Sequence, residues 1–154
     1  GHARPPVGRD GGIPAGQGPD ALAAHVLKTV IEHAGVDPKT IDDVIMGCTN
    51  QAGEDNRNVA RMAVLLADFP VDVPGQTVNR LCGSSLQALN SAAQAIWSDQ
   101  GDLFVAAGVE SMTRAPLVMA KPESEYPRGG PEVFDSTIVW RFKPPRVIVD
   151  KKIM

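Results

Sequence analysis

The sequence predicts an α/β fold in which a parallel-rich sheet is packed against helices. Between residues 19 and 109, short apolar runs alternate with segments whose apolar residues recur at helical spacing. This alternation is typical of parallel strands joined by crossover helices. Hydrophobic residues make up 43% of the chain and aromatic residues only 5%, so we expect a core of Ala, Val, Leu and Ile. The 154 residues suffice for one domain with its own core.

The first helix is predicted to begin at Pro19-Asp20, where the Asp20 carboxylate can cap free backbone N–H groups, and to end at Gly35. Its apolar residues recur at helical spacing: Leu22, Val26, Leu27, Val30, Ile31 and Ala34. The later elements are a buried strand over Asp42–Cys48, a helix over Arg57–Ala67, a strand over Gln76–Leu81, a helix over Ser84–Trp97 and a strand over Leu103–Val109. The Ser84–Trp97 helix is apolar on most faces, so we expect it to be buried.

Beyond Met112 this pattern ends, because prolines recur through the rest of the chain. We therefore predict an α/β domain over residues 1–112 and an irregular tail over residues 113–154. Composition alone favours a linker or a disordered end for this tail. Trp140 and Phe142 are expected to be packing residues rather than ligand contacts.

Composition and charge narrow the classes of function. A formal net charge of -3, with no run of like charges, provides no basic surface for nucleic acid. No apolar stretch approaches the ~18 residues of a membrane span, and no signal peptide is visible. Two cysteines do not make a disulfide framework. These observations predict a soluble cytoplasmic protein that binds neither nucleic acid nor membrane.

Several residues could in principle bind a metal ion or a phosphate, but the sequence predicts neither kind of site. The pairs Asp42-Asp43 and Glu54-Asp55 have no histidine or cysteine beside them of the kind that a zinc site uses as ligands, so no metal is predicted. His25 and His33 lie on the first predicted helix and are expected to be exposed. Gly11-Gly12 does not stand between a strand and a helix at the spacing of a dinucleotide motif.

The candidate catalytic residue is Cys82, which lies where a predicted strand gives way to the Ser84–Trp97 helix. At a helix amino terminus, free N–H groups and the helix dipole favour an anion, and the thiolate is the reactive form of cysteine. The small residues Gly83, Ser84 and Ser85 leave room for another group to approach the sulfur. The alternative is a buried cysteine that acts as a small hydrophobe.

The segment Asn79–Ala88, Asn-Arg-Leu-Cys-Gly-Ser-Ser-Leu-Gln-Ala, resembles the nucleophile motif of the thiolases, the family of acetyl-CoA acetyltransferases and 3-ketoacyl-CoA thiolases. Further segments resemble thiolase landmarks in the same order and spacing: Pro6–Arg9, Gly47–Arg61, Ala107–Pro116 and Phe134–Ile138. The likeness runs from about Arg4 to Phe142 and looks closest to the bacterial acyl-CoA and β-ketoadipyl-CoA type.

The resemblance implies a thiolase-like layered fold, made of the family's amino-terminal half-domain and the start of a loop domain that covers the active site. It implies acyl transfer between coenzyme A thioesters, by thiolysis of a 3-ketoacyl-CoA or by Claisen condensation, through a thioester on Cys82. Coenzyme A would be a substrate, and no cofactor or metal is implied. A role in fatty acid metabolism and a homodimer or homotetramer are also implied.

The sequence departs from the family pattern in several places. The family's first strand is expected to be absent before Arg4, and so is its carboxy-terminal half, with the activating histidine and the second, acid/base cysteine. Ser85 stands where thiolases usually carry glycine, and Cys48 is expected to be buried and inert. The alternative is therefore a non-catalytic fragment or oligomerisation module. A relative in the ketoacyl-synthase branch is disfavoured, because Cys48–Arg61 and Gly108–Pro116 resemble thiolases specifically.

Overall fold

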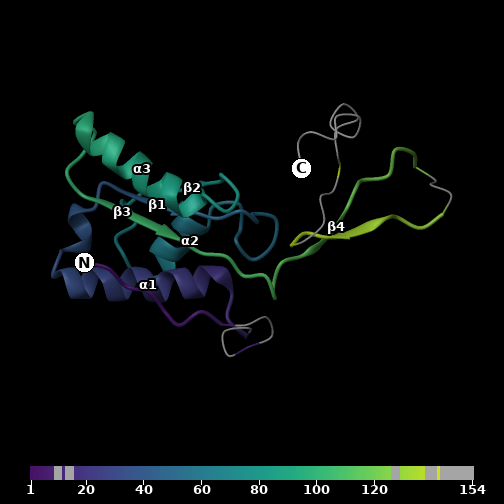
Figure 1. Ribbon diagram of the computed structural model, residues 1–154, viewed down its shortest axis with the longest axis horizontal. Helices are drawn as coiled ribbons and strands as arrows, with labels where there is room; N and C mark the ends of the chain where they lie inside the picture. The colour runs from purple at the N-terminus through teal and green to yellow at the C-terminus, as the bar shows by residue number, and fades with distance from the viewer. Residues whose placement is uncertain (9–11, 13–15, 126–128, 138–141, 143–154) are drawn as a thin grey trace. The chain divides into compact units, whose positions relative to one another are not determined.

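The computed structural model describes residues 1–8, 12, 16–125, 129–137 and 142. The chain divides into two compact units, Gly1–Arg114 and Ala115–Met154. The first unit contains the following elements in chain order: α1 Pro19–Ala34, the 3-10 helix η2 Pro38–Thr40, β1 Asp43–Gly47, α2 Val59–Leu66, β2 Gly75–Val78, α3 Ser84–Trp97 and β3 Phe104–Gly108 (Figure 1). The second contains β4 Leu117–Met119 and β5 Val133–Asp135.

A three-stranded sheet in the order β2-β1-β3 forms the centre of the first unit. Both strand pairs are parallel, and Val44 of β1 lies opposite Gly75 of β2 and Val105 of β3. The predicted parallel pairing with crossover helices is confirmed. Because every strand runs in the same direction, all three strands end at one edge of the sheet.

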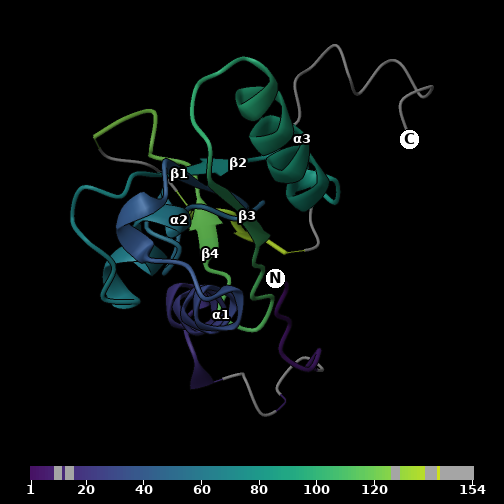
Figure 2. The ribbon, with the colours of Figure 1, turned by 90° about the vertical axis from the view of Figure 1, so that its left-hand side faces the viewer.

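Helices cover both faces of this sheet (Figures 1 and 2). In β1, Val44 and Met46 belong to the core that α1 and α2 complete, whereas Ile45 packs with Ala88 and Ala92 of α3 on the opposite face. Successive side chains of a strand point to opposite faces, so a strand buried on both faces is apolar throughout. The predicted α/β fold class is confirmed.

The first helix ends as predicted but begins with a different cap. Gly35 adopts the left-handed conformation, with φ at 65°, and its N–H donates to the carbonyls of Ile31 and Glu32. At the amino end the cap residue is Gly18, which offers no side chain. Asp20 lies inside the first turn, where its carboxylate accepts from the N–H of Ala21 at 2.8 Å. Asp20 therefore accepts from a backbone N–H of the first turn, as predicted, but the residue that precedes the helix is Gly18.

The prediction that α3 is buried is wrong. Its boundaries are those expected, but only Ser84, Ala88 and Ala92 are buried. Leu86 is 63% exposed and Trp97 is 80% exposed. The sheet contacts one face of the helix, so the apolar residues on the remaining faces stay open to solvent in this chain.

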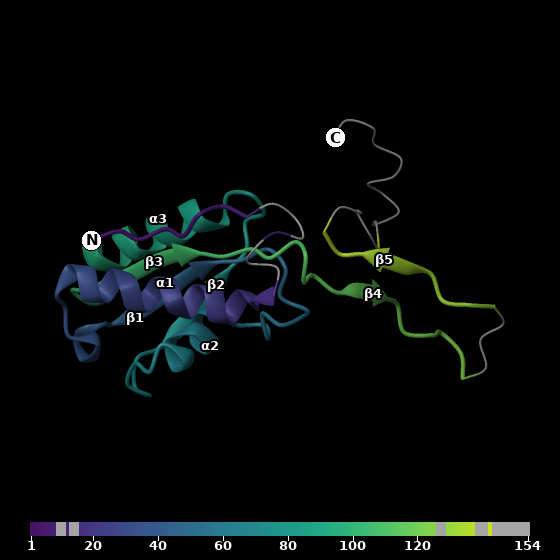
Figure 3. The same ribbon diagram turned by 90° about the horizontal axis from the view of Figure 1, so that it is seen from below.

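The second unit contains more regular structure than the predicted irregular tail. Strands β4 and β5 pair antiparallel, with Leu117 opposite Asp135 (Figure 3). Phe142 contacts Phe134 edge to face, with ring centroids 5.3 Å apart, which agrees with its expected packing role. Among the residues singled out in the sequence, Arg9, Gly11, Ile138 and Trp140 lie outside the described residues.

Candidate active site

Three loops meet where the parallel strands end. Gly47, the last residue of β1, lies opposite Val78 of β2 and Gly108 of β3. Backbone hydrogen bonds continue one residue further, from the Cys48 N–H to the Val78 carbonyl at 3.1 Å and from the Val109 N–H to the Gly47 carbonyl at 3.0 Å. The carboxyl edge of a parallel sheet is where α/β proteins commonly bind ligands.

Cys82 lies in the turn that joins β2 to α3, directly before Gly83, the cap residue of α3. It is an exposed free cysteine. The structure thus has a helix beginning beside the sulfur, as the sequence predicted, and it excludes the alternative of a buried cysteine. The strand itself ends at Val78, earlier than the expected Leu81.

The backbone just before Cys82 is strained. Leu81 has φ at +49°, a left-handed conformation that is uncommon for residues other than glycine. This conformation is incompatible with a strand, so the strand cannot include Leu81 as expected. Such strain persists only where surrounding contacts fix it, and it clusters at functional sites.

One set of contacts that fixes the turn comes from Ser84, which is buried at the start of α3. Its Oγ accepts from the Arg80 N–H at 2.8 Å and donates to the Leu81 carbonyl at 2.6 Å. Backbone bonds from Gly83 to the Arg80 carbonyl and from Ser84 to the Leu81 carbonyl, both 3.0 Å, close the same turn. Cys82 is therefore held inside a hydrogen-bonded turn over residues 80–84.

A second set of contacts comes from the loop after β1. The Asn79 side chain accepts from the Leu81 N–H at 2.9 Å and donates to the Thr49 carbonyl at 3.0 Å. The Thr49 hydroxyl in turn donates to the Leu81 carbonyl at 3.3 Å. The strained residue is thus bonded through both its N–H and its carbonyl.

Two glycines let α3 approach the strand ends closely. A Cβ on Gly108 would overlap the Ser85 hydroxyl and lie 2.8 Å from the Ser85 Cβ, and a Cβ on Gly47 would lie 2.7 Å from the Ser84 carbonyl oxygen. The crowding expected from Ser85 is therefore accommodated by Gly108, which has no side chain.

The buried Cys48 thiol lies close to two carboxylates, that of the buried Asp55 and that of the exposed Glu110. Cys48 is 1% exposed, and its Sγ donates to the Asn50 carbonyl at 3.0 Å. The Sγ lies 3.9 Å from an Asp55 oxygen and 4.0 Å from a Glu110 oxygen. Burial, followed by the charges of Glu110 and Asp55, raises the pKa of Cys48 to about 12. Cys48 is buried as predicted, and its thiol stays protonated at neutral pH.

Asp55 is itself only 6% exposed. Burial is the main cause that raises the pKa of its carboxyl group, and the Glu110 charge adds to it. The buried Asp55 carboxyl group thus lies within the influence of the exposed Glu110 carboxylate.

The other acidic residues singled out in the sequence make structural contacts. Asp42 accepts from the N–H groups of Leu103 and Asp102, which lowers the pKa of its carboxyl group, and Glu54 forms an ion pair with Arg114. Across the part of the chain that the structure describes, no three His, Cys, Asp or Glu side chains gather as a metal ion would require.

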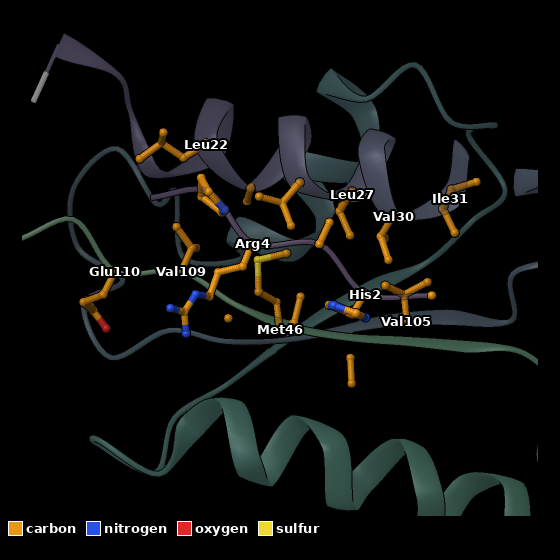
Figure 4. A pocket seen from close by; sticks show the side chains of 18 of the residues that line it. His2, Arg4, Leu22, Leu27, Val30, Ile31, Met46, Val105, Val109 and Glu110 are labelled. Atoms are coloured by element: carbon orange, nitrogen blue, oxygen red, sulfur yellow. The ribbon is translucent and has the colours of Figure 1, made fainter. Parts of the chain in front are cut away.

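The histidines do not join Cys82. His25 and His33 are exposed on α1, as predicted. His2 lines a cavity of about 670 Å³ between α1, β3 and the amino-terminal segment (Figure 4). Leu22, Leu27 and Val30 of α1 line the same cavity, whereas Cys82 does not. This apolar cavity lies on the α1 face of the sheet, and residues 80–84 do not line it.

Sequence reasoning did not identify the residues that hold the turn, namely Thr49, Asn79, Ser84 and Glu110. A signal for two of them was available, because Thr49 and Glu110 each come directly after a predicted strand, whereas Asn79 was placed inside one. Since parallel strands end at one edge, polar side chains placed just beyond them are brought together. Within the described residues, no helix combines the length and apolar character needed to cross a bilayer.

The first unit is thus an α/β domain that presents an exposed cysteine at the start of a helix. The family model "Thiolase, N-terminal domain" matches residues 1–141. This chain belongs to the thiolase family, which confirms the resemblance found in the sequence.

Relatives extend this result. A β-ketoadipyl-CoA thiolase from Escherichia coli is 56% identical over 143 residues, which are 92% of this chain and 35% of that protein. A 3-oxoadipyl-CoA/3-oxo-5,6-dehydrosuberyl-CoA thiolase from Escherichia coli strain K12 is 55% identical with the same coverage. The crystal structure of the Bacillus anthracis acetyl-CoA acetyltransferase matches with a TM-score of 0.77 at 36% identity, over 84% of this chain and 33% of that one. The chain spans about a third of the length of these relatives.

Proposed function

We propose that this chain carries the nucleophile of a thiolase-type acyltransferase, and that Cys82 is that nucleophile. The observation that carries the proposal is the exposed Cys82 in a fixed turn at the start of α3. Relatives of this chain are named for β-ketoadipyl-CoA and acetyl-CoA, which supports coenzyme A thioesters as the substrates.

In the proposed reaction, the Cys82 thiolate attacks the carbonyl carbon of an acyl-CoA thioester. A bond forms between Cys82 Sγ and that carbon, the bond to the coenzyme A sulfur breaks, and coenzyme A leaves as the thiol after taking up a proton. Backbone N–H groups at the start of α3 favour the negative charge that develops on the thioester oxygen. Coenzyme A serves as substrate and group carrier, and no resident cofactor is part of the proposal.

The proton-transfer groups of the complete reaction are proposed to come from outside this chain. His25 and His33 are exposed on α1, and Cys48 is held as a protonated thiol. For this chain alone, we therefore expect acylation of Cys82 rather than full turnover. We also propose a role in acyl-CoA chemistry of the fatty acid type.

A second candidate function, an assembly module, is favoured by the exposed face of α3. Leu86, Leu89 and Trp97 are more than half exposed on this helix. We propose that the chain forms homo-oligomers, because large exposed apolar side chains on one helix are typical of association surfaces. The two unpaired cysteines support a cytoplasmic location.

Incubation of the full chain with acetyl-CoA, followed by intact-mass measurement and peptide mapping, tests the enzymatic proposal. We expect one acetyl group on Cys82 and none on the Cys82→Ser variant. If no adduct forms at any pH up to about 9, where a free thiol is largely ionised, the assembly module becomes the favoured function.

A further inference from the structure

We propose that Glu110 is a positioning residue for the turn over residues 80–84, called the nucleophile turn, and acts on Cys82 through Thr49. The inference rests on the proposed role of Cys82. Glu110 lies two residues beyond the end of β3. Its Oε2 accepts from the Thr49 N–H at 2.8 Å, and its Oε1 accepts from the Asn50 N–H at 3.1 Å. One carboxylate thus holds two consecutive N–H groups of the loop after β1.

Thr49 in turn is hydrogen-bonded to residues that lie just before Cys82. Its carbonyl accepts from the Asn79 side chain, and its hydroxyl donates to the Leu81 carbonyl. Asn79 and Leu81 belong to the segment that leads into Cys82, and Leu81 is the residue with positive φ. Glu110 therefore connects the end of β3 to the strained backbone beside the nucleophile without touching Cys82 itself.

The negative charge of Glu110 disfavours the ionised forms of two neighbouring groups, Cys48 and Asp55. The carboxylate lies 4.0 Å from the buried Cys48 Sγ, and its charge disfavours ionisation of the neighbouring Asp55. A neutral glutamine of the same size would remove this repulsion. It would also lose one of the two acceptor oxygens, and its amide group would face a backbone N–H instead. A carboxylate, unlike an amide, can therefore accept from both N–H groups, one with each oxygen.

The test compares Glu110→Gln with Glu54→Gln, a control that also removes one carboxylate but breaks the ion pair with Arg114. Hydrogen exchange of the full chain reports directly on the turn. For Glu110→Gln we expect exchange of the amides in residues 79–84 to rise by at least about tenfold, because hydrogen bonds to charged groups are among the stronger ones. Exchange in α1 should stay unchanged, and Glu54→Gln should leave residues 79–84 as in the wild type. Unchanged exchange in residues 79–84 of Glu110→Gln would overturn the proposal.

A double-mutant cycle tests whether Glu110 acts through Thr49. Thr49→Val removes the hydroxyl bonded to Leu81, and we expect Glu110→Gln to add less to exchange of residues 79–84 in that background than in the wild type. Fully additive effects would contradict the proposal. If Glu110→Gln does not fold, Glu110→Asp is measured in its place, because it keeps the charge but shortens the reach to Thr49 and Asn50.

Acetylation kinetics separate positioning from a merely structural role. With acetyl-CoA varied, Glu110→Gln should lower the maximal rate of Cys82 acetylation while the half-saturating concentration stays within about twofold, since the substrate contacts are unchanged. A wild-type chain that is not acetylated would remove the proposed function of Cys82, whereas the exchange measurement would still decide whether Glu110 holds the turn.

Discussion

Ser85 occupies the space that a side chain on Gly108 would need. The Ser85 hydroxyl lies where a Gly108 Cβ would be built, and the Ser85 Cβ lies 2.8 Å from that position. Through this contact the first turn of α3 rests on the end of β3, which brings the helix start beside the three strand ends. The position of Cys82 depends on this close packing.

We predict that Gly108→Ala lowers the free energy of unfolding by about 1–3 kcal/mol, the usual effect of overpacking. Combining it with Ser85→Gly should recover most of the loss, because both clashing atoms are then removed. Urea unfolding of the single and double variants measures this. Gly47→Ala is the control, since its new Cβ would meet the Ser84 backbone and Ser85→Gly cannot relieve that contact. Equal losses for Gly108→Ala with and without Ser85→Gly would show that the two residues do not compete for space.

The buried thiol predicts a specific loss of stability in alkali. The pKa of Cys48 is raised to about 12 in the folded chain, against 9.0 for an ordinary cysteine. Below pH 9 both states hold the proton, so Cys48 adds no pH dependence. Between pH 9.0 and about pH 12 the unfolded chain releases the Cys48 proton while the folded chain keeps it. The free energy of unfolding therefore falls by up to about 1.4 kcal/mol per pH unit in this range.

Urea unfolding from pH 8 upward, compared between the wild type and Cys48→Ala, isolates this contribution. The variant should lose stability less steeply in the alkaline range, whatever its stability at pH 8. A Cys48→Ala slope equal to that of the wild type would argue against a protonated, buried Cys48.

Replacing Asp55 or Asp42 by a neutral asparagine should change the stability of the chain in opposite directions. The pKa of Asp55 is raised by burial, so its ionised form opposes folding, and its contribution to stability is lost as the pH rises through the folded value. The pKa of Asp42 is lowered by the Leu103 and Asp102 N–H groups, so its ionised form favours folding. We predict that Asp55→Asn stabilises the chain at pH 7.5 and Asp42→Asn destabilises it.

Both differences from the wild type should shrink as the pH falls and the carboxyl groups take up protons. Thermal unfolding midpoints at pH 7.5 and at mildly acidic pH measure them. A stabilising effect of Asp55→Asn that grows toward acid would contradict the assigned direction.

The local features of the site could be predicted from the sequence, because short-range chemistry determines them. The boundaries of α3 follow from its apolar period and the small residues before it, and those same residues indicated that Cys82 lies beside the start of a helix. The positive φ of Leu81 could not be predicted, since no glycine marks it. The contacts from Glu110 and Asn79 to Thr49 join loops distant in sequence, so they depend on the register of three strands.

The exposure of α3 shows that burial is harder to predict from the sequence than helix boundaries are. An apolar pattern indicates which faces of a helix avoid water, but it does not say which of them this chain covers. Ala88 and Ala92 face the sheet because their small side chains allow close packing, whereas Leu86 and Leu89 point away from it.

We predict that this exposed face drives association. Sedimentation of the wild type should show a mass that rises with concentration. Replacing Leu86 and Leu89 together by Gln should shift dissociation to at least about tenfold higher concentration, because burying one leucine contributes about 1.5–3 kcal/mol. Val71→Gln is the control, since Val71 is 69% exposed but lies outside α3. A wild-type monomer at all concentrations would contradict the prediction.

The most direct measurement follows the acyl group on and off the two cysteines of the full chain. After reaction with acetyl-CoA, mass mapping should find the acetyl group on Cys82, with Cys48 unmodified, and added coenzyme A should remove it and regenerate acetyl-CoA. An acetyl group that is found on Cys48, or that stays on Cys82 in excess coenzyme A, would contradict acyl transfer through this turn.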